Sequence, residues 1–393
     1  MRVLVSTTAG SGHFGPLIPF CVACRGAGHE VRVAAPASFA EAVAGAGFDH
    51  APFADVAPEV MGPIFGRLPE LSMEEANATV IGQIFGRLDA QAALPGVMAA
   101  IDRWRPDLVM REPTEFASLV AAERAGIAQV QVAIGILGAF EATWPVLSEP
   151  LAELSVMAGL AADRAFATMV RTPELTCVPA SLDEPLDGQG RDAFERGPRW
   201  RFRDSSWRSE GGAMPPSWGD PQLPLVYVTF GSVTGSLEPF AGMYPATLAA
   251  LGDAPVRVLM TTGSAIDPAS LEPWPTNAHV EQWWPQADVM AHAAVVVGHG
   301  GFGTTMMALA AGVPQVVVPL FAFDQAVNAE RVAGVGAGIH LGGGPRAAAE
   351  LPAAVSAALS DPAYRAGAAA IAAEMAALPD SAAAVTVLER LAT

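Results

Sequence analysis

The sequence predicts an α/β protein with two Rossmann-like domains in tandem, each built on a doubly wound parallel sheet. Strand and helix patterns alternate from the first residue onward. Two glycine turns with the same spacing, GSGHFG at 10–15 and GHGGFG at 298–303, each follow an apolar strand pattern. The chain has 393 residues, which is too many for one ordinary core, and 51% of them are hydrophobic.

The first series of elements begins with the strand pattern RVLVST, followed by a helix from about Pro16 to Ala27, because proline suits a first helical position. The later patterns are a strand EVRVAAP (30–36), a helix around 39–46, and strands PDLVMRE (106–112) and AQVQVAIG (128–135). This alternation predicts right-handed crossovers and a parallel sheet.

The second series of elements follows a Gly-, Pro- and Arg-rich segment at about 185–222. That segment includes RWRFR and GGAMPPSWGDPQLP and is expected to be a linker after a last edge strand. The expected strands are LVYVTFGS, from 225, then VRVLMTTG, HVEQWW, AAVVVGHGG and PQVVVPL. Residues 293–323 contain no charged side chain, but glycines, Pro314 and Pro319 divide them into strand, helix and strand. They therefore predict a buried parallel sheet and not a membrane span.

Composition excludes several classes of function. The net charge of −18, without a dense basic patch, argues against nucleic acid and anionic membrane surfaces. All 22 basic residues are arginines, which excludes a Walker loop, a Schiff-base lysine and a lysine-dependent short-chain dehydrogenase. No secretory signal pattern is present, so we expect a cytoplasmic protein. Cys21 and Cys24, in CVAC, are expected to pack inside a helix, with redox or metal binding as the less favoured reading.

Neither glycine turn fits a dinucleotide fingerprint fully. After GSGHFG the only candidate for a ribose contact is Glu30, which begins the second strand instead of ending it. After GHGGFG, Asp324 has the right spacing, but this turn follows the fourth strand of its domain and not the first. Both turns do place backbone N–H groups and a helix N-terminus at the carboxyl edge of a sheet, where anions bind. His299, Thr304 and Thr305 would add side-chain donors for a diphosphate without metal or lysine.

Three strings then reveal a resemblance to a known family. WWPQ (283–286), HGGFGTT (299–305) and PLFAFDQAVNAERV (319–332) are similar to the donor region of inverting nucleotide-sugar glycosyltransferases with the GT-B fold. The chain most resembles the bacterial enzymes that decorate polyketides, macrolides and related antibiotics. The likeness runs from GHFGPLIPF and GHEVRVA near the start to DPAYRAGAAAIAAEMAALP near the end.

The resemblance implies two Rossmann-like domains that face each other across a cleft. Residues 1–205 would bind the acceptor, 206–222 would be the linker and 223–378 would bind the nucleotide sugar. A C-terminal helix in 379–393 would cross back and pack on the first domain. The implied donor-binding residues are Ser232, Trp283, Gln286, His299, Gly301, Gly303, Thr304, Asp324 and Gln325. Among these, Trp283 would stack on the base, Gln286 would contact the ribose, and Asp324 with Gln325 would face the sugar hydroxyls.

The resemblance also makes His13 the general base and Glu112 the acidic residue that orients it. The chemistry agrees, because an acceptor hydroxyl loses a proton as it attacks the anomeric carbon and a histidine is a suitable base near neutral pH. The residues alone leave four structural alternatives open. In these, His13 caps its turn, Glu112 ends a strand, Asp324 caps a helix and His299 is a structural turn residue. Of Trp283 and Trp284, one is expected to be exposed and the other to belong to the core.

The expected function is transfer of a hexose or deoxyhexose from a TDP- or UDP-sugar to an apolar aglycone, without metal or other cofactor. Met61, Phe65, Phe85, Phe140 and Trp144 are candidates to line the acceptor pocket. Homodimer formation stays open, as does O- versus C-glycosyl transfer. The alternatives are an NAD(P)-dependent oxidoreductase, a non-catalytic glycosyltransferase partner and a sugar-nucleotide epimerase.

One short repeat receives no function from the sequence. GPIFGRL at 62–68 recurs as GQIFGRL at 82–88. Two copies are too few for a repeat architecture, and a flexible insertion beside a cleft and a chance duplication explain them equally well.

Overall fold

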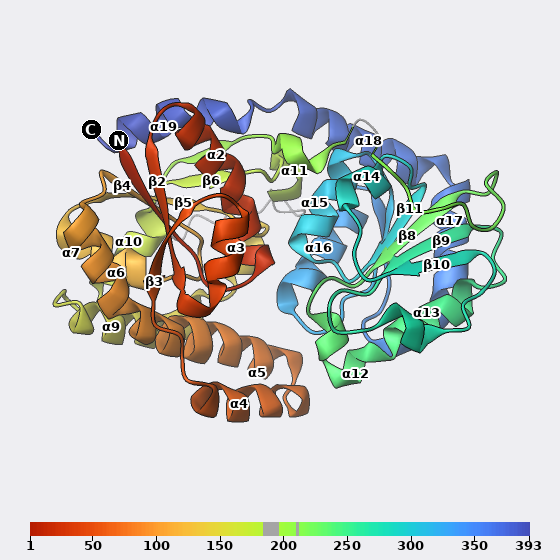
Figure 1. Cartoon of the computed structure of the whole chain (residues 1–393), viewed down its shortest axis with the longest axis horizontal. Helices are drawn as coiled ribbons and strands as arrows, with labels where there is room; N and C mark the ends of the chain where they lie inside the picture. The colour runs from red at the N-terminus through yellow and green to blue at the C-terminus, as the bar shows by residue number, and fades with distance from the viewer. Residues whose placement is uncertain (184–195, 210–211) are drawn as a thin grey trace. The chain divides into compact units, whose positions relative to one another are not determined.

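The computed structural model describes residues 1–183, 196–209 and 212–393, and the chain divides into two compact units. Unit 1 contains Met1–Val178, the described part of Asp187–Asp204, and Leu378–Thr393. Unit 2 contains the described part of Pro179–Leu186 and Ser205–Ala377. Each unit has a parallel sheet with helices packed against it, so the expected α/β fold with two Rossmann-like domains is confirmed (Figure 1).

Unit 1 is built on a seven-stranded parallel sheet in the order β3-β2-β1-β4-β5-β6-β7. Its strands are β1 (Arg2–Ser6), β2 (Glu30–Pro36), β3 (Asp49–Phe53), β4 (Leu108–Arg111), β5 (Ala128–Val132), β6 (Glu174–Thr176) and β7 (Arg199–Arg201). Its helices are α1 (Ser11–Phe14), α2 (Ile18–Gly26), α3 (Ala40–Gly45), α4 (Pro58–Arg67), α5 (Met73–Ala78), a π-helix (Thr79–Asp89), α6 (Ala90–Trp104), α7 (Ala117–Ala125), α8 (Leu137–Glu141), α9 (Trp144–Met157), α10 (Arg164–Arg171) and α19 (Ala384–Leu391).

Unit 2 is built on a six-stranded parallel sheet in the order β10-β9-β8-β11-β12-β13. Its strands are β8 (Leu225–Thr229), β9 (Arg257–Thr261), β10 (Ala278–Glu281), β11 (Val295–Gly298), β12 (Gln315–Val317) and β13 (Gly338–His340). Its helices are α11 (Ala180–Asp183), α12 (Glu238–Ala241), α13 (Met243–Leu251), α14 (Gln286–Met290), α15 (Phe302–Ala310), α16 (Phe323–Gly334), α17 (Leu351–Ser360) and α18 (Pro362–Ala377).

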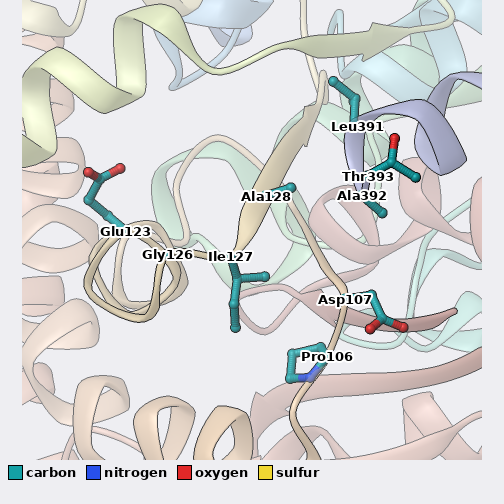
Figure 2. A pocket seen from close by; sticks show the side chains of 9 residues that line it. All are labelled: Pro106, Asp107, Glu123, Gly126, Ile127, Ala128, Leu391, Ala392 and Thr393. Atoms are coloured by element: carbon teal, nitrogen blue, oxygen red, sulfur yellow. The ribbon is translucent and has the colours of Figure 1, made fainter.

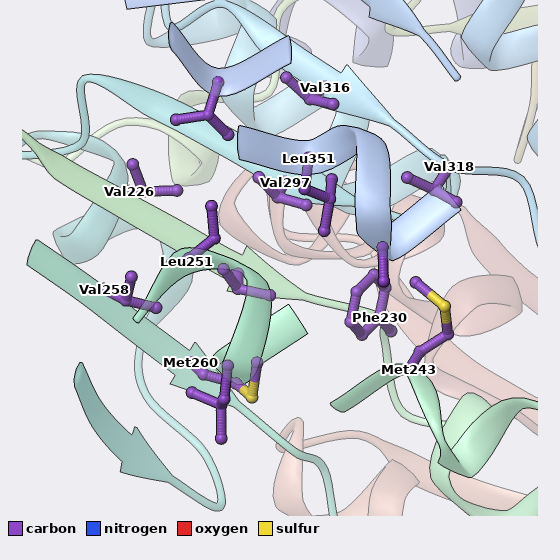
Figure 3. Close-up of a cluster of buried hydrophobic side chains, with 14 of the residues drawn as sticks. Val226, Phe230, Met243, Leu251, Val258, Met260, Val297, Val316, Val318 and Leu351 are labelled. Atoms are coloured by element: carbon purple, nitrogen blue, oxygen red, sulfur yellow. The ribbon is translucent and has the colours of Figure 1, made fainter. Parts of the chain in front are cut away.

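Alternation along the strands of unit 2 explains how its sheet is buried on both faces. In β8, Val226 and Val228 contribute to one core cluster, which also holds Leu351 of α17 (Figure 3). Leu225 and Tyr227 of the same strand contribute to a second cluster with residues of α14 and α15. The charge-free sequence 293–323 is therefore the centre of a buried sheet, as predicted. No helix in the described part of the chain has the length and apolar character needed to cross a membrane.

Several short strands were missing from the sequence expectation. β3, β7 and β13 are edge strands, and β6 has only three residues, so none shows a strong apolar pattern. β3 contains Pro52, which is tolerated at a sheet edge. The RWRFR string of the Gly-, Pro- and Arg-rich segment contains the edge strand β7, which pairs with β6 inside the predicted first domain of residues 1–205. Residues 184–195 and 210–211, most of which belong to that segment, lie outside the described residues.

Candidate functional site

His13 and Glu112 come together because of the strand order of unit 1. The order reverses between β1 and β4, which is where ligands bind in open α/β sheets. His13 follows β1 and Glu112 follows β4, and the N–H of Glu112 donates to the carbonyl of Ser6 at the end of β1. Gly10, with φ of 129°, makes the turn that leads back toward His13. The His13 Nδ1 to Glu112 Oε1 distance is 3.3 Å.

The Glu112 carboxylate is completely buried and held by hydrogen bonds on both oxygens. Thr8 donates to Oε1 from its backbone N–H (3.2 Å) and its hydroxyl (3.0 Å). The Thr114 N–H donates to Oε2 at 2.5 Å, and the Thr114 hydroxyl lies 2.9 Å from Oε1 and 2.8 Å from Oε2. That hydroxyl is also 3.2 Å from His13 Nδ1, so it links the imidazole to the carboxylate. His13 Nε2 is the ring nitrogen that these contacts do not use.

Glu112 stays ionised although it is buried. Burial is the largest influence and opposes the charged form, but the charge of His13 and the hydrogen bonds from His13 and Thr114 together outweigh it. The pKa of Glu112 is therefore lowered to about 2. A carboxylate held in this way fixes the imidazole tautomer with the proton on Nδ1 and leaves Nε2 able to accept a proton.

A buried arginine balances the acidic residues behind this pair. Arg111 is fully buried and donates to the Glu112 carbonyl (3.1 Å) and to Gln131 Oε1 (3.0 Å). Burial lowers the pKa of Arg111 to about 10, and Glu115, Glu112 and Glu174 oppose this shift. Glu115 accepts from the N–H groups of Ala117 (3.0 Å) and Ser118 (3.0 Å) at the start of α7. Arg111 therefore remains a cation among these carboxylates.

The second copy of the short repeat packs against His13. GQIFGRL forms most of the π-helix, and the Phe85 ring lies 5.3 Å from the His13 ring, centroid to centroid. Asp89, the last residue of this helix, interacts electrostatically with His13 and Glu112. Phe65, the equivalent of Phe85 in the first copy, is 51% exposed on α4. Only the second copy is therefore part of the His13 site.

The other candidates for acceptor binding lie in different environments. Met61, like Phe65, is on α4, which has no buried residue. Phe140 is partly buried against the unit 1 core, and Trp144 is a buried member of that core. Phe85 is thus the one member of this set with a ring contact to His13 among the described residues. The acceptor-binding role of all five residues stays a prediction.

His299 lies at the reversal of strand order in unit 2, after β11, the strand that corresponds to β4 of unit 1. β11 lies next to β8 in this sheet. A Cβ on Gly231 would lie 2.7 Å from His299 Cε1, and one on Gly301 would lie 2.6 Å from Cε1 and Nε2. Two glycines therefore allow the backbone to approach the ring closely. Burial lowers the pKa of His299 to about 4, so the ring is neutral near pH 7. Its buried Nδ1 has no hydrogen-bond partner among the described residues.

Several predicted donor residues contact one another around the start of α15. The Thr304 hydroxyl, in the first turn, lies 3.2 Å from Gln286 Oε1. Gln286 also shares a side-chain hydrogen bond with Tyr227 of β8. Gly301 is the N-cap residue of α15, and Gly303 is exposed in its first turn. This helix end carries a partial positive charge suited to an anion.

The start of α16 braces the same glycine turn. Gln325 is buried, and its Oε1 accepts from the N–H groups of Leu320 (2.8 Å) and Phe321 (3.1 Å). Asn328 Nδ2 donates to the Gly300 carbonyl at 2.7 Å. Asp324 is exposed in the first turn of α16. The side-chain oxygen of Gln325 is thus bound by backbone N–H groups, and its contact with a sugar stays a prediction.

The two adjacent tryptophans have opposite environments. The Trp283 side chain is 71% exposed, whereas Trp284 packs on the unit 2 core and donates to the Ala213 carbonyl at 3.0 Å. β10 ends at Glu281, so this pair lies in the following loop and not in the strand that was expected. Ser232 is exposed one residue after Gly231. The exposed ring of Trp283 is available for stacking.

A hollow at the opposite edge of the unit 1 sheet is separate from these residues. It is lined by Pro106, Asp107, Glu123, Gly126, Ile127, Ala128, Leu391, Ala392 and Thr393 (Figure 2). It lies at the amino ends of β4 and β5, whereas His13 and Glu112 follow carboxyl ends. Asp107 accepts from the Arg2 N–H at 2.7 Å, and Glu123 pairs with Arg164. These partners give the acidic groups a structural role.

The two cysteines of CVAC pack inside a helix, as the sequence predicts. Cys21 and Cys24 are both buried in α2. Burial raises the pKa of the Cys21 thiol well above its usual value and that of the Cys24 thiol to about 12. Both therefore remain protonated and unreactive near neutral pH.

Sequence reasoning missed Thr8, Thr114 and Asp89 in the His13 site, and Gln286 was not expected to bind Thr304. Thr114 had a weak signal, because it follows Glu112 by two residues in the same turn after a strand. Asp89 had none, because its position depends on the winding of the π-helix.

Comparison with known proteins identifies the family. Models of the N-terminal and C-terminal domains of erythromycin biosynthesis protein CIII-like proteins match residues 22–186 and 246–391. The L-demethylnoviosyl transferase of Streptomyces niveus is 32% identical over 350 residues, covering 87% of this chain and 85% of that protein. TDP-daunosamine transferase DnrS of Streptomyces peucetius is 30% identical, covering 100% and 97%.

A solved structure of a protein with bound nucleotide is similar to this chain over nearly its whole length. Glycosyltransferase SsfS6 of Streptomyces sp. SF2575, complexed with thymidine diphosphate, is 27% identical, covers 99% of each chain and has a TM-score of 0.75. The chain therefore belongs to the erythromycin biosynthesis protein CIII-like family of bacterial natural-product glycosyltransferases, whose members have the GT-B fold.

Proposed function

We propose that this enzyme transfers a hexose or deoxyhexose from a TDP- or UDP-sugar to an apolar natural-product aglycone, with inversion at the anomeric carbon. His13 acts as the general base, and no metal or other cofactor is needed. The observation that carries the proposal is the fully buried, ionised Glu112, joined to His13 directly and through Thr114. The names of the relatives support the substrates, since one is named TDP-daunosamine transferase and the SsfS6 structure contains thymidine diphosphate.

The reaction uses His13 Nε2 as the proton acceptor. The acceptor group loses its proton to Nε2 while it forms a bond to the anomeric carbon. The bond from that carbon to the diphosphate breaks, and the diphosphate leaves with the electron pair. Glu112 stabilises the imidazolium that results, through Nδ1. The proton passes to solvent after the product departs.

The predicted donor-binding residues of unit 2 would stabilise the leaving group. The N-terminus of α15 and a neutral His299 would donate hydrogen bonds to the diphosphate oxygens. Thr304 is held beside them by Gln286. The exposed Trp283 would stack on the base, Ser232 would lie near the phosphates, and Asp324 with Gln325 would contact the sugar. These groups carry out the task that a divalent cation performs in other transferases, so EDTA should leave the rate unchanged.

A panel of apolar aglycones with TDP- and UDP-sugars, with and without EDTA, tests the proposal by mass spectrometry. NMR of the product gives the anomeric configuration, and acid hydrolysis separates an O-glycoside from a resistant C-glycoside. His13→Gln should lower kcat by about 10²–10⁴-fold, the contribution expected of a general base, with thymidine diphosphate binding unchanged.

The matched control for this experiment is His292→Gln, since His292 is exposed in unit 2 and belongs to no part of the proposed machinery. Its kcat should equal that of the wild-type enzyme. An unchanged kcat in His13→Gln would remove His13 from the mechanism, and retention of configuration would exclude the inverting reaction. Tight NAD(P)H binding without binding of any nucleotide diphosphate would favour the oxidoreductase alternative.

A further inference from the structure

Asp89 lies at the end of the π-helix that packs against His13. Phe85, whose ring is 5.3 Å from the His13 ring, precedes Asp89 by four residues. Residues four apart in a helix lie on the same face, so Asp89 is on the face that is turned to His13. π-Helical segments occur frequently at functional sites. The sequence predicted a role for only one residue of this helix, Phe85 as a candidate for the acceptor pocket, and none for Asp89.

The carboxylate of Asp89 has acidic neighbours and one group that can become positive. Burial raises its pKa most, the interaction with His13 lowers it, and Glu112, Asp55 and Glu115 raise it, with a result of about 6. Asp89 is only partly buried, and no side-chain hydrogen bond from a described residue contributes to its pKa. A carboxylate placed this way destabilises the folded protein. Titratable groups whose pKa is shifted by burial and by charged neighbours cluster at functional sites.

We propose that Asp89 is a positioning residue for the transfer reaction: a second carboxylate that, together with Glu112, stabilises the imidazolium of His13. This inference rests on the proposed function. When the acceptor's proton moves to His13 Nε2, the ring gains a positive charge and the two carboxylates favour that charge. Glu112 acts through Nδ1, whereas Asp89 acts through space from the π-helix. Asp89 neither contacts substrate nor exchanges the proton.

The experiment compares Asp89→Asn with Asp89→Glu and with Asp102→Asn. Asp102 is exposed on α6, the helix that follows the π-helix, so its variant has the same change in net charge away from the site. For Asp89→Asn we expect kcat to fall about tenfold, which corresponds to one modest transition-state interaction, with KM for both substrates changed less than twofold. Asp89→Glu should recover most of kcat, and Asp102→Asn should match the wild-type enzyme.

Thermal unfolding separates this role from a structural one. The folded-state pKa of Asp89 is raised above its unfolded value, so ionisation of this group disfavours folding as pH rises through about 6. Asp89→Asn should therefore have a higher Tm than the wild-type protein at pH 8 and an equal Tm at pH 4. A residue that only stabilised the fold would give a lower Tm at pH 8.

NMR of the His13 ring protons tests the contact without any substrate. The resonance of the His13 ring is the one that disappears in the His13→Gln variant. Relative to the wild-type protein, the titration midpoint of this resonance should move to lower pH in Asp89→Asn but not in Asp102→Asn. An unmoved midpoint, or a lower Tm at pH 8 with unchanged kcat, would overturn the inference. If no donor and acceptor pair gives product with the wild-type enzyme, the proposed function fails, while the midpoint and Tm still decide whether Asp89 acts on His13.

Discussion

At the scale of single residues, Thr114 is the least expected part of the site. Its hydroxyl lies within hydrogen-bonding distance of His13 Nδ1 and of both oxygens of Glu112. It has one proton, so donation to the carboxylate leaves its oxygen free to accept from Nδ1–H. The Thr114 hydroxyl thus links His13 to Glu112 by hydrogen bonds, in addition to the direct distance of 3.3 Å between His13 Nδ1 and Glu112 Oε1.

Replacing this hydroxyl should lower the rate. Thr114→Val keeps the shape and the backbone N–H bond to Glu112 but removes the hydroxyl. A hydrogen bond to a charged group contributes about 1.5–3 kcal/mol, so kcat should fall roughly tenfold to a hundredfold. Steady-state kinetics provides the measurement, with Thr114→Ser as the matched control that retains most of kcat. Equal rates for the valine and serine variants would show that the hydroxyl has no part in the reaction.

The sequence predicted which residues lie in the turns after the strands, but it did not predict the hydrogen-bond partners of these residues. His13 lies in the glycine turn after one apolar strand pattern and Glu112 directly follows another, and parallel strands carry such residues to one sheet edge. Glu112 was assigned from the family resemblance, which implies an acidic residue after a later strand, and the residues alone left an ordinary strand end open. The partnership of His13 with Thr114 joins positions 101 residues apart, and no local pattern contains it.

At the scale of elements, the two copies of the short repeat have different roles. Gly82 and Gly86 of the π-helix are buried against α9, whereas Gly62 and Gly66 of α4 are exposed. A Cβ on Gly86 would lie 3.0 Å from the Ile81 carbonyl oxygen and 3.2 Å from atoms of Leu147 and Pro150. A Cβ on Gly66 would have no neighbour within 4 Å. Two heptapeptides that differ at one residue thus lie in a packed helix in one place and in an exposed helix in another.

The same substitution should therefore have opposite effects in the two copies. Gly86→Ala should lower the free energy of unfolding by about 1–3 kcal/mol, because it overpacks the interface with α9. It should also lower kcat, since it displaces the neighbouring Phe85 from His13. Gly66→Ala should raise the free energy of unfolding by about 0.5–1 kcal/mol, the difference in helix propensity. Urea unfolding measures both, and effects of the same sign would contradict this account.

At the scale of the whole molecule, the charge of the protein opposes that of its proposed donor. The formal charge is −18, and a nucleotide diphosphate is also an anion. The helix end and His299 act within hydrogen-bonding range, whereas the net charge acts over a Debye length of about 10 Å at 0.1 M salt. Salt should therefore change the rate at which the donor approaches the protein more than it changes the hydrogen bonds that hold the bound diphosphate.

Stopped-flow measurement of thymidine diphosphate association tests this balance. The association rate constant should rise as NaCl increases from roughly 20 mM to roughly 200 mM, because salt screens the repulsion. Association of uncharged thymidine, the control ligand, should change little. A rate constant that falls with salt would mean that the local positive field of the site dominates at long range as well.

The sequence by itself determined the fold class, the succession along the chain of the strands that are buried on both faces, the two glycine turns and the residue types in and after them. These features depend on local chemistry: apolar runs predict buried strands, and glycine allows close backbone approach. The tertiary structure alone decided the edge strands, the link through Thr114, the buried carboxylate's ionisation and the place of Asp89. Each of these depends on contacts and burial between segments far apart in the chain, which a local pattern does not encode.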